Sequence, residues 1–536
     1  MPREEQHNFI QKLEEKLEEK AILSTEKFPK PEDFLKIMKE MGLFEHINAY
    51  EKVLHCAQIV KENGGRALLV GGCVRDALMG RISKDFDLEI YKLEPAKVEK
   101  LVQQIGKVSD VGKAFGILKI SLKGGLDIDI SLPRIDSKIG IGHRGFEVKT
   151  DPYMTIKDAA RRRDFTINSI AADPLTGELY DPFGGVEDIK KKILRITDPE
   201  RFKDDPLRVL RALQFIGRFG LEIDKNSLAI IQEMTPRIKE LPKERIGEEW
   251  KKLLLKSEKP SLGLSAGMTL GVFREIHPEF PPLVETQQEL EWHPEGDVWV
   301  HTLMTVDEAA KIIRRERLDD NRSLTILLAS LCHDIGKPMT TRYEKGRVIS
   351  PGHEVAGEEP TKTFLATIGI DNLTRNKVIK LVTNHLIPTA FYIEEAVRGN
   401  KISDGAIRRL AKRIYPATIQ ELVFVSEADH LGRGTFSPET KEQLLLPDDQ
   451  FPAGAWLLER ARKLEVESSR PADLTRGRDW LNLGYKPGKN IGTLIRLSNE
   501  LRDEIGLSKE GVFKIVDGVD DSNKAIEKLR ALLKEK

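Results

Sequence analysis

The chain has 536 residues, of which 40% are hydrophobic and 32% charged, a composition that fits a folded globular protein and excludes disordered, collagen-like and membrane-embedded classes. Lys and Arg (86) balance Asp and Glu (86), so any phosphate-binding surface must be a local patch. Three scattered cysteines without a CxxC pair exclude a disulfide scaffold and a cysteine-ligated zinc site, and they favour the reducing cytoplasm.

The predicted elements follow one another in five segments. Residues 1–50 carry apolar residues at helical spacing and predict a helical extension. Over 51–190, short β-like runs with glycine turns alternate with a helical run, which is typical of an α+β domain. Amphipathic helical patterns with proline and glycine breaks then continue through 191–290, 291–440 and 441–536. The expected fold class is therefore α+β, with a mixed head followed by an all-helical body.

Two predicted strands of the head carry alternating carboxylates. The run KDFDLEI alternates polar and apolar residues, so Asp85, Asp87 and Glu89 share one face of a strand. The run LDIDI places Asp127 and Asp129 together in the same way. Clustered carboxylates repel one another unless a cation neutralises them, and Mg²⁺ accepts carboxylates together with phosphate oxygens. The pattern predicts Mg²⁺ at Asp85 and Asp87, although a single acidic strand is more often merely solvated.

A pair of glycines stands just before the first acidic strand. The run LVGGCVRD predicts a strand, then Gly71 and Gly72, and then a helix that carries Arg75 near its start. Glycines let the backbone approach a polyphosphate closely, and the N–H groups at a helix start attract it. An arginine adds donors for phosphate oxygens. The glycine pair and the acidic strand together predict a site that binds a nucleotide and its metal ion.

These residues resemble the opening motif of the polymerase-β nucleotidyltransferases, in the family of class II tRNA nucleotidyltransferases and bacterial poly(A) polymerases. The resemblance rests on GGxVRD, which includes Gly72 and Arg75, and on the DxD of Asp85 and Asp87. It implies that the two aspartates hold metals that activate an RNA 3′-hydroxyl and steady the leaving pyrophosphate. It also implies a third catalytic carboxylate on the following strand, for which Asp129 is the candidate.

Two further motifs follow in the order of that family. The run RRRDFTIN resembles the family's RRDFTIN motif, in which the second arginine of the RRD, here Arg163, contacts the nucleotide. The run DDPLRVLR resembles the EDxxR motif, which implies that Asp205 and Arg208 face the incoming base, with Arg211 one turn further. On a helix, Asp205 and Arg208 would share a face. Without the family context, a solvated basic patch and an ordinary ion pair are the commoner explanations.

The pair of Asp205 and Arg208 has a definite preference among bases. A carboxylate only accepts hydrogen bonds and a guanidinium only donates them. Cytosine and adenine present an amino donor beside a ring-nitrogen acceptor, whereas guanine and uracil present a carbonyl beside an N–H. The pair therefore suits CTP and ATP, and a mismatch would discriminate by about 10⁴-fold. The Gly-rich run at 135–146 resembles the flexible loop of complete CCA-adding members, which favours addition of all three nucleotides.

The second half of the chain contains a histidine cluster. The set of His301, His333, Asp334 and Asp429 resembles the H…HD…D metal ligands of the HD phosphohydrolase superfamily. Imidazole and carboxylate together suit a transition metal such as Ni²⁺ or Mn²⁺. The resemblance implies a metal-dependent phosphatase or 2′,3′-cyclic phosphodiesterase in an HD domain at 291–440. Four other histidines lie in this part of the chain: His353 and His385 match extra ligands of some members, while His293 and His430 are interpreted as structural.

The resemblance, carried by motifs in the order of the family, implies an enzyme that adds C, C and A to the 3′ end of tRNA, and the cysteine usage favours the cytoplasm. The expected partners are tRNA, CTP and ATP, with no membrane and no DNA, and 191–290 is expected to read the base and bind tRNA. One alternative is an A-adding enzyme or poly(A) polymerase that shares the head motifs. Another is an HD phosphohydrolase of RNA ends or nucleotides whose head only binds RNA. A third alternative is a stringent-response enzyme. Those enzymes also join an HD domain to a nucleotidyltransferase domain, but with the HD domain first, whereas here it comes second.

Overall fold

A computed structural model describes residues 29–40, 42–83, 85–106, 108–109, 117–121, 127–138, 146–441 and 444–534. The chain divides into two compact units, residues 1–241 and 242–536. The division falls inside the segment 191–290 that was expected to form one neck. Among the helices described, none combines the length and the apolar character that crossing a bilayer requires.

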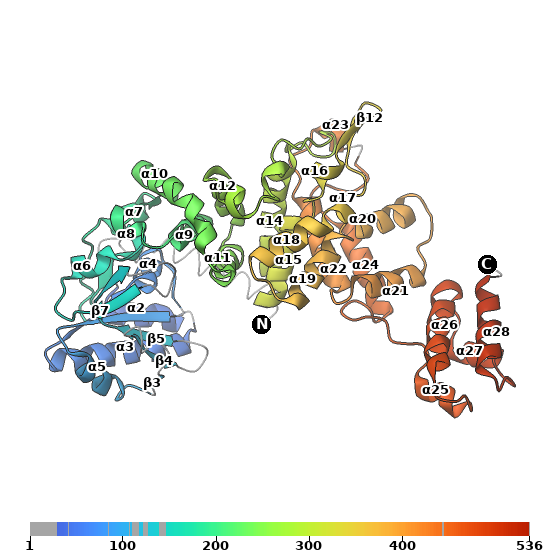
Figure 1. The fold of residues 1–536 in the computed structure, drawn as a ribbon, viewed down its shortest axis with the longest axis horizontal. Helices are drawn as coiled ribbons and strands as arrows, with labels where there is room; N and C mark the ends of the chain where they lie inside the picture. Colours follow the sequence, from blue (N-terminus) through green and yellow to red (C-terminus); the bar gives the residue numbers. More distant parts are fainter. Residues whose placement is uncertain are drawn as a thin grey trace. The chain divides into compact units, whose positions relative to one another are not determined.

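The first unit is built around a mixed sheet (Figure 1). Strands β2 and β5 run parallel, and every other neighbouring pair of the described sheet is antiparallel. In sheet order the strands are β3 (Val108–Ser109), β4 (Ile117–Ser121), β5 (Asp127–Ser131), β2 (Asp85–Tyr91), β1 (Arg66–Val70), β8 (Ala171–Ala172) and β9 (Leu179–Tyr180). Two short pairs lie outside it: β6 (Arg134–Lys138) with β7 (Phe146–Thr150), and β10 (Ile193–Leu194) with β11 (Glu222–Ile223).

The first unit also contains helices. They are α2 (Pro31–Glu40), α3 (Phe44–Glu62), α4 (Gly72–Leu78), α5 (Pro95–Val102), α6 (Ile156–Arg161), α7 (Gly185–Lys190), α8 (Pro199–Phe202), α9 (Leu207–Phe219) and α10 (Lys225–Met234). Of these, α3 and α4 pack against the sheet. The ring of Tyr50 on α3 contacts the ring of Phe86 on β2, with centroids 5.8 Å apart. Because side chains alternate along a strand, this contact leaves Asp85 and Asp87 on the face away from α3. The predicted boundary at residue 50 falls inside α3, and residues 1–28 lie outside the described residues.

The second unit is mainly helical. Its first part contains α11 (Lys243–Lys256), α12 (Pro260–Thr269), α13 (Val272–Ile276), α14 (Val298–Arg315), α15 (Asp320–Cys332), α16 (Lys337–Thr340), α17 (His353–Ala356), α18 (Glu358–Thr367), α19 (Asn372–Val382) and α20 (Ile387–Tyr392). The rest contains α21 (Asp404–Ile414), α22 (Ile419–Leu431), α23 (Pro438–Lys441), α24 (Pro452–Lys463), α25 (Gly477–Asn482), α26 (Lys489–Ile505), α27 (Lys509–Ile515) and α28 (Ser522–Lys534). The mixed α+β class with a helical body is confirmed.

One detail of the helical body was predicted wrongly. A hairpin of β12 (Arg342–Glu344) and β13 (Arg347–Ile349) interrupts the helices, so the body is not entirely helical. The two residues of its turn, Lys345 and Gly346, both have positive φ, of 51° and 81°. Such a turn matches the twist of paired strands, and glycine adopts it without strain.

Helix α15 is buried among other helices in the first part of the second unit. Its residues from Ser323 to Cys332 are all buried, and α14, α19 and α22 pack against it. A helix that is apolar on all sides needs neighbours on all sides. The residues that directly follow α15 are therefore held among the flanking helices, which is where His333 and Asp334 stand.

A buried histidine in this unit predicts a pH dependence of stability. His277 lies in an aromatic cluster, where its Nε2 accepts a hydrogen bond from Trp250 Nε1 at 2.9 Å. Burial lowers the pKa of His277 to about 3. The unfolded chain binds a proton there below pH ~6.5 while the folded chain does not. This contribution to stability is therefore complete above pH ~6.5 and is lost as the pH falls toward 3.

We expect His277→Gln to weaken the dependence of the unfolding free energy on pH between 6 and 5 by about 1.4 kcal/mol per pH unit. Urea unfolding followed by tryptophan fluorescence measures this, because all five tryptophans lie beyond residue 241. His55→Gln, at an exposed position on α3, should leave the slope unchanged. Equal slopes for His277→Gln and the unsubstituted protein would contradict the prediction.

Candidate active sites

Carboxylates from two strands meet on one face of the sheet in the first unit. The parallel register sets Asp85 beside Asp127 and Asp87 beside Asp129. The alternation of the strands turns these side chains to the face opposite Phe86. The sequence predicted the two pairs, and the structure shows that they are neighbours.

Burial and mutual repulsion act on these carboxylates. Burial raises the pKa of Asp87 to about 6. Arg163 lowers this pKa, whereas the nearby charges of Asp129 and Asp85 raise it. Burial also raises the pKa of Asp129. Asp127 differs, because its Oδ2 lies 2.7 Å from Lys119 Nζ and this hydrogen bond lowers its pKa. A bound cation would therefore stabilise the ionised forms of Asp87 and Asp129 more than that of Asp127.

The donor set on this face fits Mg²⁺. Carboxylate oxygens are the ligands that Mg²⁺ prefers. Asp129 Oδ1 is buried, and it receives no hydrogen bond from the residues that the structure describes, although Lys119 Nζ lies 3.8 Å from it. Asp85 is exposed at the beginning of β2 and can add a further oxygen. Asp85, Asp87 and Asp129 together are therefore suited to a hard divalent cation that also binds phosphate.

Gly71 joins β1 to α4 beside these carboxylates. Its φ is 72°, in the left-handed region that glycine adopts without strain. A Cβ at this position would lie 2.8 Å from Arg163 Nη1 and 3.6 Å from Asp87 Oδ2. Gly72, the predicted phosphate contact, is the first residue of α4. The turn thus lies next to both Arg163 and the acidic face.

We expect Gly71→Ala to lower nucleotide addition at least about 10-fold, because the new Cβ must displace Arg163 and narrow the turn. Gly80→Ala is the matched control: its φ is 74°, and no described atom lies within 4 Å of the added Cβ. Both substitutions strain the backbone, because both glycines have a positive φ. Equal losses of addition rate in the two variants would contradict a special role for the Gly71 turn.

Arg75 is buried within the head. Its Nη1 donates to Asn168 Oδ1 at 2.6 Å and its Nε to Asp76 Oδ1 at 2.8 Å. The rings of Phe215 and Phe219 on α9 lie against the guanidinium, and only 5% of the residue is exposed. To contact a phosphate, Arg75 would have to break its hydrogen bonds to Asn168 and Asp76. The contact therefore stays a prediction.

Asn168 connects Arg75 to α9 through Asp164. Its Nδ2 donates to Asp164 Oδ1 at 2.9 Å, and Arg211 Nε donates to Asp164 Oδ2 at 2.5 Å. Although burial opposes ionisation, Arg211 and Asn168 lower the pKa of Asp164 to about 2. Arg211, predicted to contact the nucleotide, is therefore tied to the ionised aspartate that follows Arg163.

Asp205 does not lie on the helix that carries Arg208, which corrects the expectation that the two share a helical face. Helix α9 begins at Leu207, and Asp205 Oδ1 accepts a hydrogen bond from the Leu207 N–H at 3.0 Å. A residue before proline avoids the helical conformation, so Pro206 explains the break. Arg208 lies in the first turn and donates to the carbonyl oxygen of Arg162 at 2.6 Å. The base-reading roles of Asp205 and Arg208 stay predictions.

The loop predicted at 135–146 is only partly described. Residues 139–145 lie outside the described residues. The segments on either side of them form the antiparallel pair β6 and β7. The predicted loop is therefore shorter than 135–146, because strands occupy both of its ends.

The four predicted HD ligands come together in the second unit. His301 lies on α14, His333 and Asp334 follow α15, and Asp429 lies on α22. His301 Nε2 lies 3.2 Å from His333 Nε2, 3.0 Å from Asp429 Oδ1 and 3.7 Å from Asp334 Oδ2. Ligands bound at about 2.1 Å from a metal lie roughly 3.0–3.4 Å apart. The spacing and the two nitrogen and two oxygen donors fit one divalent transition metal.

Backbone carbonyls orient three imidazoles around this site. The Nδ1 atoms of His333, His353 and His385 each lie 2.7–2.8 Å from the carbonyl oxygen three residues earlier. Donation from Nδ1–H leaves the Nε2 lone pair free for a metal. His353, His385 and Asp334 form a second group of possible ligands, in which Asp334 Oδ1 lies 3.1 Å from His353 Nε2. Asp334 therefore belongs to two adjoining groups.

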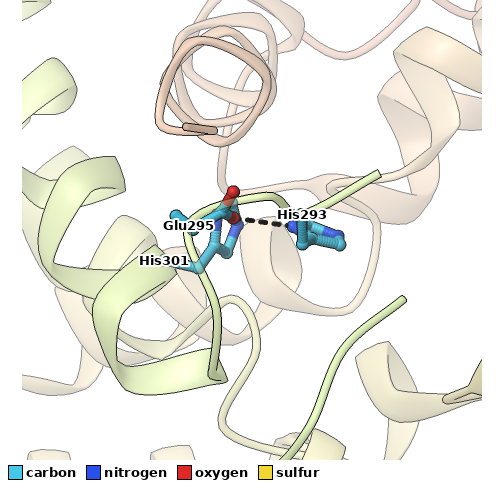
Figure 2. A group of neighbouring side chains, drawn as sticks. All are labelled: His293, Glu295 and His301. Carbon is cyan, nitrogen blue, oxygen red and sulfur yellow. Dashed lines mark hydrogen bonds and ion pairs between the residues drawn. The ribbon is translucent and has the colours of Figure 1, made fainter. Parts of the chain in front are cut away.

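The sequence interpretation missed two residues of this site. Lys337 Nζ lies 2.6 Å from Asp334 Oδ2, and the i,i+3 spacing in HDIGK could have indicated it. Glu295 contacts both His293 and His301 (Figure 2). Nothing local marks Glu295, because it lies in the irregular segment before α14. His430 is bonded through Nε2 to the Pro447 carbonyl oxygen at 2.6 Å, which suits the structural role expected of it.

Three family profiles match the chain in succession. The poly A polymerase head domain matches residues 67–195, and a probable RNA- and SrmB-binding site of polymerase A matches residues 220–283. The HD domain matches residues 298–434. The segments agree in order with the sheet-containing first unit and with the histidine cluster of the second.

Known proteins are similar over most of the chain. The multifunctional CCA proteins of Xylella fastidiosa strain M23 and Stenotrophomonas maltophilia strain K279a are each 33% identical to it, and the alignments cover 69% and 68% of this chain and 84% and 86% of theirs. A Bacillus stearothermophilus CCA-adding enzyme in complex with CTP shares the fold, with 19% identity, a TM-score of 0.58 and coverage of 91% and 99%. A Thermotoga maritima CCA-adding enzyme in complex with tRNA does so with 18% identity, a TM-score of 0.51 and coverage of 91% and 95%. The chain belongs to the family of multifunctional CCA proteins, tRNA nucleotidyltransferases in which an HD domain follows a poly(A) polymerase-type head.

Proposed function

We propose that the chain completes the 3′ end of tRNA by adding C, C and A from CTP and ATP. The observation that carries the proposal is the parallel register that sets Asp87 beside Asp129, next to the Gly71 turn and Arg163. Oxygen donors beside a turn that admits phosphates are what nucleotidyl transfer needs. Relatives named for CCA, and related structures that hold CTP or tRNA, support the same choice.

The residues of the head have separate tasks in this proposal. Asp85, Asp87 and Asp129 would hold two Mg²⁺ ions, which would lower the pKa of the 3′-hydroxyl and neutralise charge on the leaving pyrophosphate. The backbone at Gly71 and Gly72, with Arg163, binds the triphosphate. The 3′-oxygen bonds to the α-phosphorus as the bond to pyrophosphate breaks, and the hydroxyl proton passes to water.

The decisive experiment offers tRNA that lacks its 3′ CCA, with Mg²⁺ and each nucleoside triphosphate in turn. We expect C, C and then A to be added, with no product from UTP or GTP. Addition of A alone, or of a homopolymer, would favour an A-adding enzyme or poly(A) polymerase instead. Sequencing the product ends distinguishes these outcomes.

Selection of the base is assigned to Asp205 and Arg208. We expect Asp205→Asn to reduce the preference for CTP over UTP about 10²-fold, because asparagine adds a donor where the cytosine amino group needs an acceptor. The ratio of kcat/KM for the two nucleotides measures this. Glu200→Gln, at an exposed position on α8, makes a similar change nearby and should leave the ratio unchanged. An unaltered ratio in Asp205→Asn would remove Asp205 from base reading.

We also propose that the HD domain hydrolyses phosphate esters, including 2′,3′-cyclic phosphates, with a bound transition metal such as Ni²⁺ or Mn²⁺. The convergence of His301, His333, Asp334 and Asp429 at metal-ligand spacing supports this. Turnover of a 2′,3′-cyclic nucleotide with Ni²⁺ is expected. An absence of turnover with both Ni²⁺ and Mn²⁺ would remove the proposal while leaving nucleotide addition untouched.

A further inference from the structure

Glu89 is the third carboxylate on the acidic face of β2, and its surroundings differ from those of the first two. It follows Asp87 by two residues, so it lies on the same face about 7 Å further along the strand. Only 2% of its side chain is exposed. Its Oε2 accepts a hydrogen bond from the Tyr91 hydroxyl at 2.7 Å, and its Oε1 accepts one from Arg162 Nη2 at 2.9 Å. Donors of the protein itself therefore occupy both oxygens.

Two arginines keep Glu89 ionised inside the protein. Burial raises the pKa of Glu89, but the charges of Arg163 and Arg162 outweigh burial and lower this pKa below its usual value. Arg163 Nη2 lies 3.9 Å from Glu89 Oε1, which is an ion pair without a hydrogen bond. A buried carboxylate that lost such partners would be strongly destabilising. The carboxylate and the two guanidinium groups therefore form one unit.

The guanidinium of Arg163 reaches from Glu89 toward the Gly71 turn. Its Nη1 lies 2.8 Å from the position that a Cβ would take at Gly71, while its Nη2 is the atom nearest to Glu89. Only 16% of the side chain is exposed, and it donates no hydrogen bond to the residues that the structure describes. Unused guanidinium donors beside a glycine turn are suited to phosphate oxygens.

Arg162 fixes the segment that carries Arg163. It directly follows α6, and among the described residues Glu89 is the carboxylate with which it pairs. Its carbonyl oxygen accepts a hydrogen bond from Arg208 Nη2 at 2.6 Å. Arg162 is thus held by β2 through its side chain and by α9 through its backbone. Because Arg163 is the next residue, these contacts limit where its guanidinium can lie.

We propose that Glu89 is a positioning residue for nucleotide addition. Its carboxylate holds Arg162 by a hydrogen bond and Arg163 by charge, so that the Arg163 guanidinium is directed at the Gly71 turn before a triphosphate binds. Donors that are already oriented lose less conformational entropy on binding. The inference rests on the proposed function, which assigns the triphosphate to Arg163, and it gives the third acidic residue of β2 a role other than metal binding.

The test compares Glu89→Gln with Glu178→Gln in the full-length protein. The rate of addition to tRNA that lacks the next C or A is measured against the concentration of CTP or ATP, with saturating Mg²⁺. Glutamine keeps the shape of Glu89 and removes its charge. We expect KM to rise about 10-fold for both nucleotides and kcat to change less than about three-fold, because the two nucleotides share the triphosphate. Glu178 pairs with Arg66 at 3.2 Å but is 59% exposed, and Glu178→Gln should leave KM unchanged.

A combination with Arg163→Gln separates a positioning role from a structural one. If Glu89 acts through Arg163, the variant that carries both substitutions should have the KM of Arg163→Gln within about two-fold. Losses that multiply in the double variant would overturn the inference, because they would show that Glu89 acts independently of Arg163.

The outcomes also separate this inference from the proposed function. If Arg163→Gln leaves KM unchanged, the assignment of the triphosphate to Arg163 fails, and this inference fails with it. If Arg163→Gln raises KM and Glu89→Gln does not, only the role of Glu89 is overturned. Because Glu89→Gln could lose its fold, Tyr91→Phe is a second variant, which keeps the buried ring and removes the hydroxyl that donates to Glu89. We expect its KM to rise about three-fold, and an unchanged KM would overturn the inference.

Discussion

Replacing Asp87 by asparagine is expected to lower the rate of nucleotide addition to tRNA by at least about 10³-fold. The carboxylate lies beside Asp129 on the neighbouring strand and close to the Gly71 turn. An asparagine keeps the shape and removes the charge that a divalent cation needs, and such a ligand contributes several kcal/mol to transition-state stabilisation. Single-turnover addition of CTP to tRNA lacking its 3′ end, with saturating Mg²⁺, measures the loss.

Asp127→Asn is the matched control for this experiment. Asp127 lies on the same sheet face but is paired with Lys119 at 2.7 Å, so its charge is already compensated. We expect addition within about three-fold of the unsubstituted rate, because no role in metal binding is assigned to it. If Asp87→Asn retained the addition rate, or if both variants lost it equally, the assignment of the metal site would be wrong.

Replacing Asp334 by asparagine is expected to abolish binding of a transition metal in the HD domain. Asp334 belongs to both groups of ligands, so a single substitution removes an oxygen from each. Hydrolysis of a 2′,3′-cyclic nucleotide should fall at least about 10³-fold, because the bound metal would supply several kcal/mol of charge stabilisation. Nucleotide addition by the head should remain within about two-fold, which shows that the protein is folded.

Asp320→Asn makes the same chemical change at the exposed beginning of α15, the helix that leads to Asp334. Hydrolysis and metal binding should be unaffected there. Hydrolysis that persists in Asp334→Asn would place the active centre of the HD domain elsewhere. A parallel loss of nucleotide addition would show instead that the substitution disturbs the whole chain.

Local patterns were sufficient for much of the candidate sites. The alternation in KDFDLEI predicted which side chains of β2 share a face, because a strand allows only two faces. Helical patterns were likewise predicted for 291–440, and α15 ends directly before His333. In both cases the information lies within about ten residues of chain.

Long-range contacts account for most of what was not predicted. The register that sets Asp87 beside Asp129 depends on the pairing of two strands separated by a helix and two other strands. Arg75 carries the sequence signal of a phosphate ligand, yet it is covered by two rings from α9, far along the chain. The contacts of Glu295 likewise require the end of α22 to return to the segment before α14. The position of Asp205 outside α9, in contrast, had a local signal. Pro206 disfavours a helical conformation for the residue before it, but the resemblance to the EDxxR motif led to the expectation of one helix.

The contact between Tyr50 and Phe86 has a practical consequence for anyone who wishes to study the catalytic head alone. A fragment that starts at residue 51 would cut α3 in its first half and remove the aromatic ring that covers the apolar side of β2. The strand that presents Asp85 and Asp87 would then expose its underside to water, and aggregation would follow. A usable fragment must keep all of α3, beginning no later than Phe44.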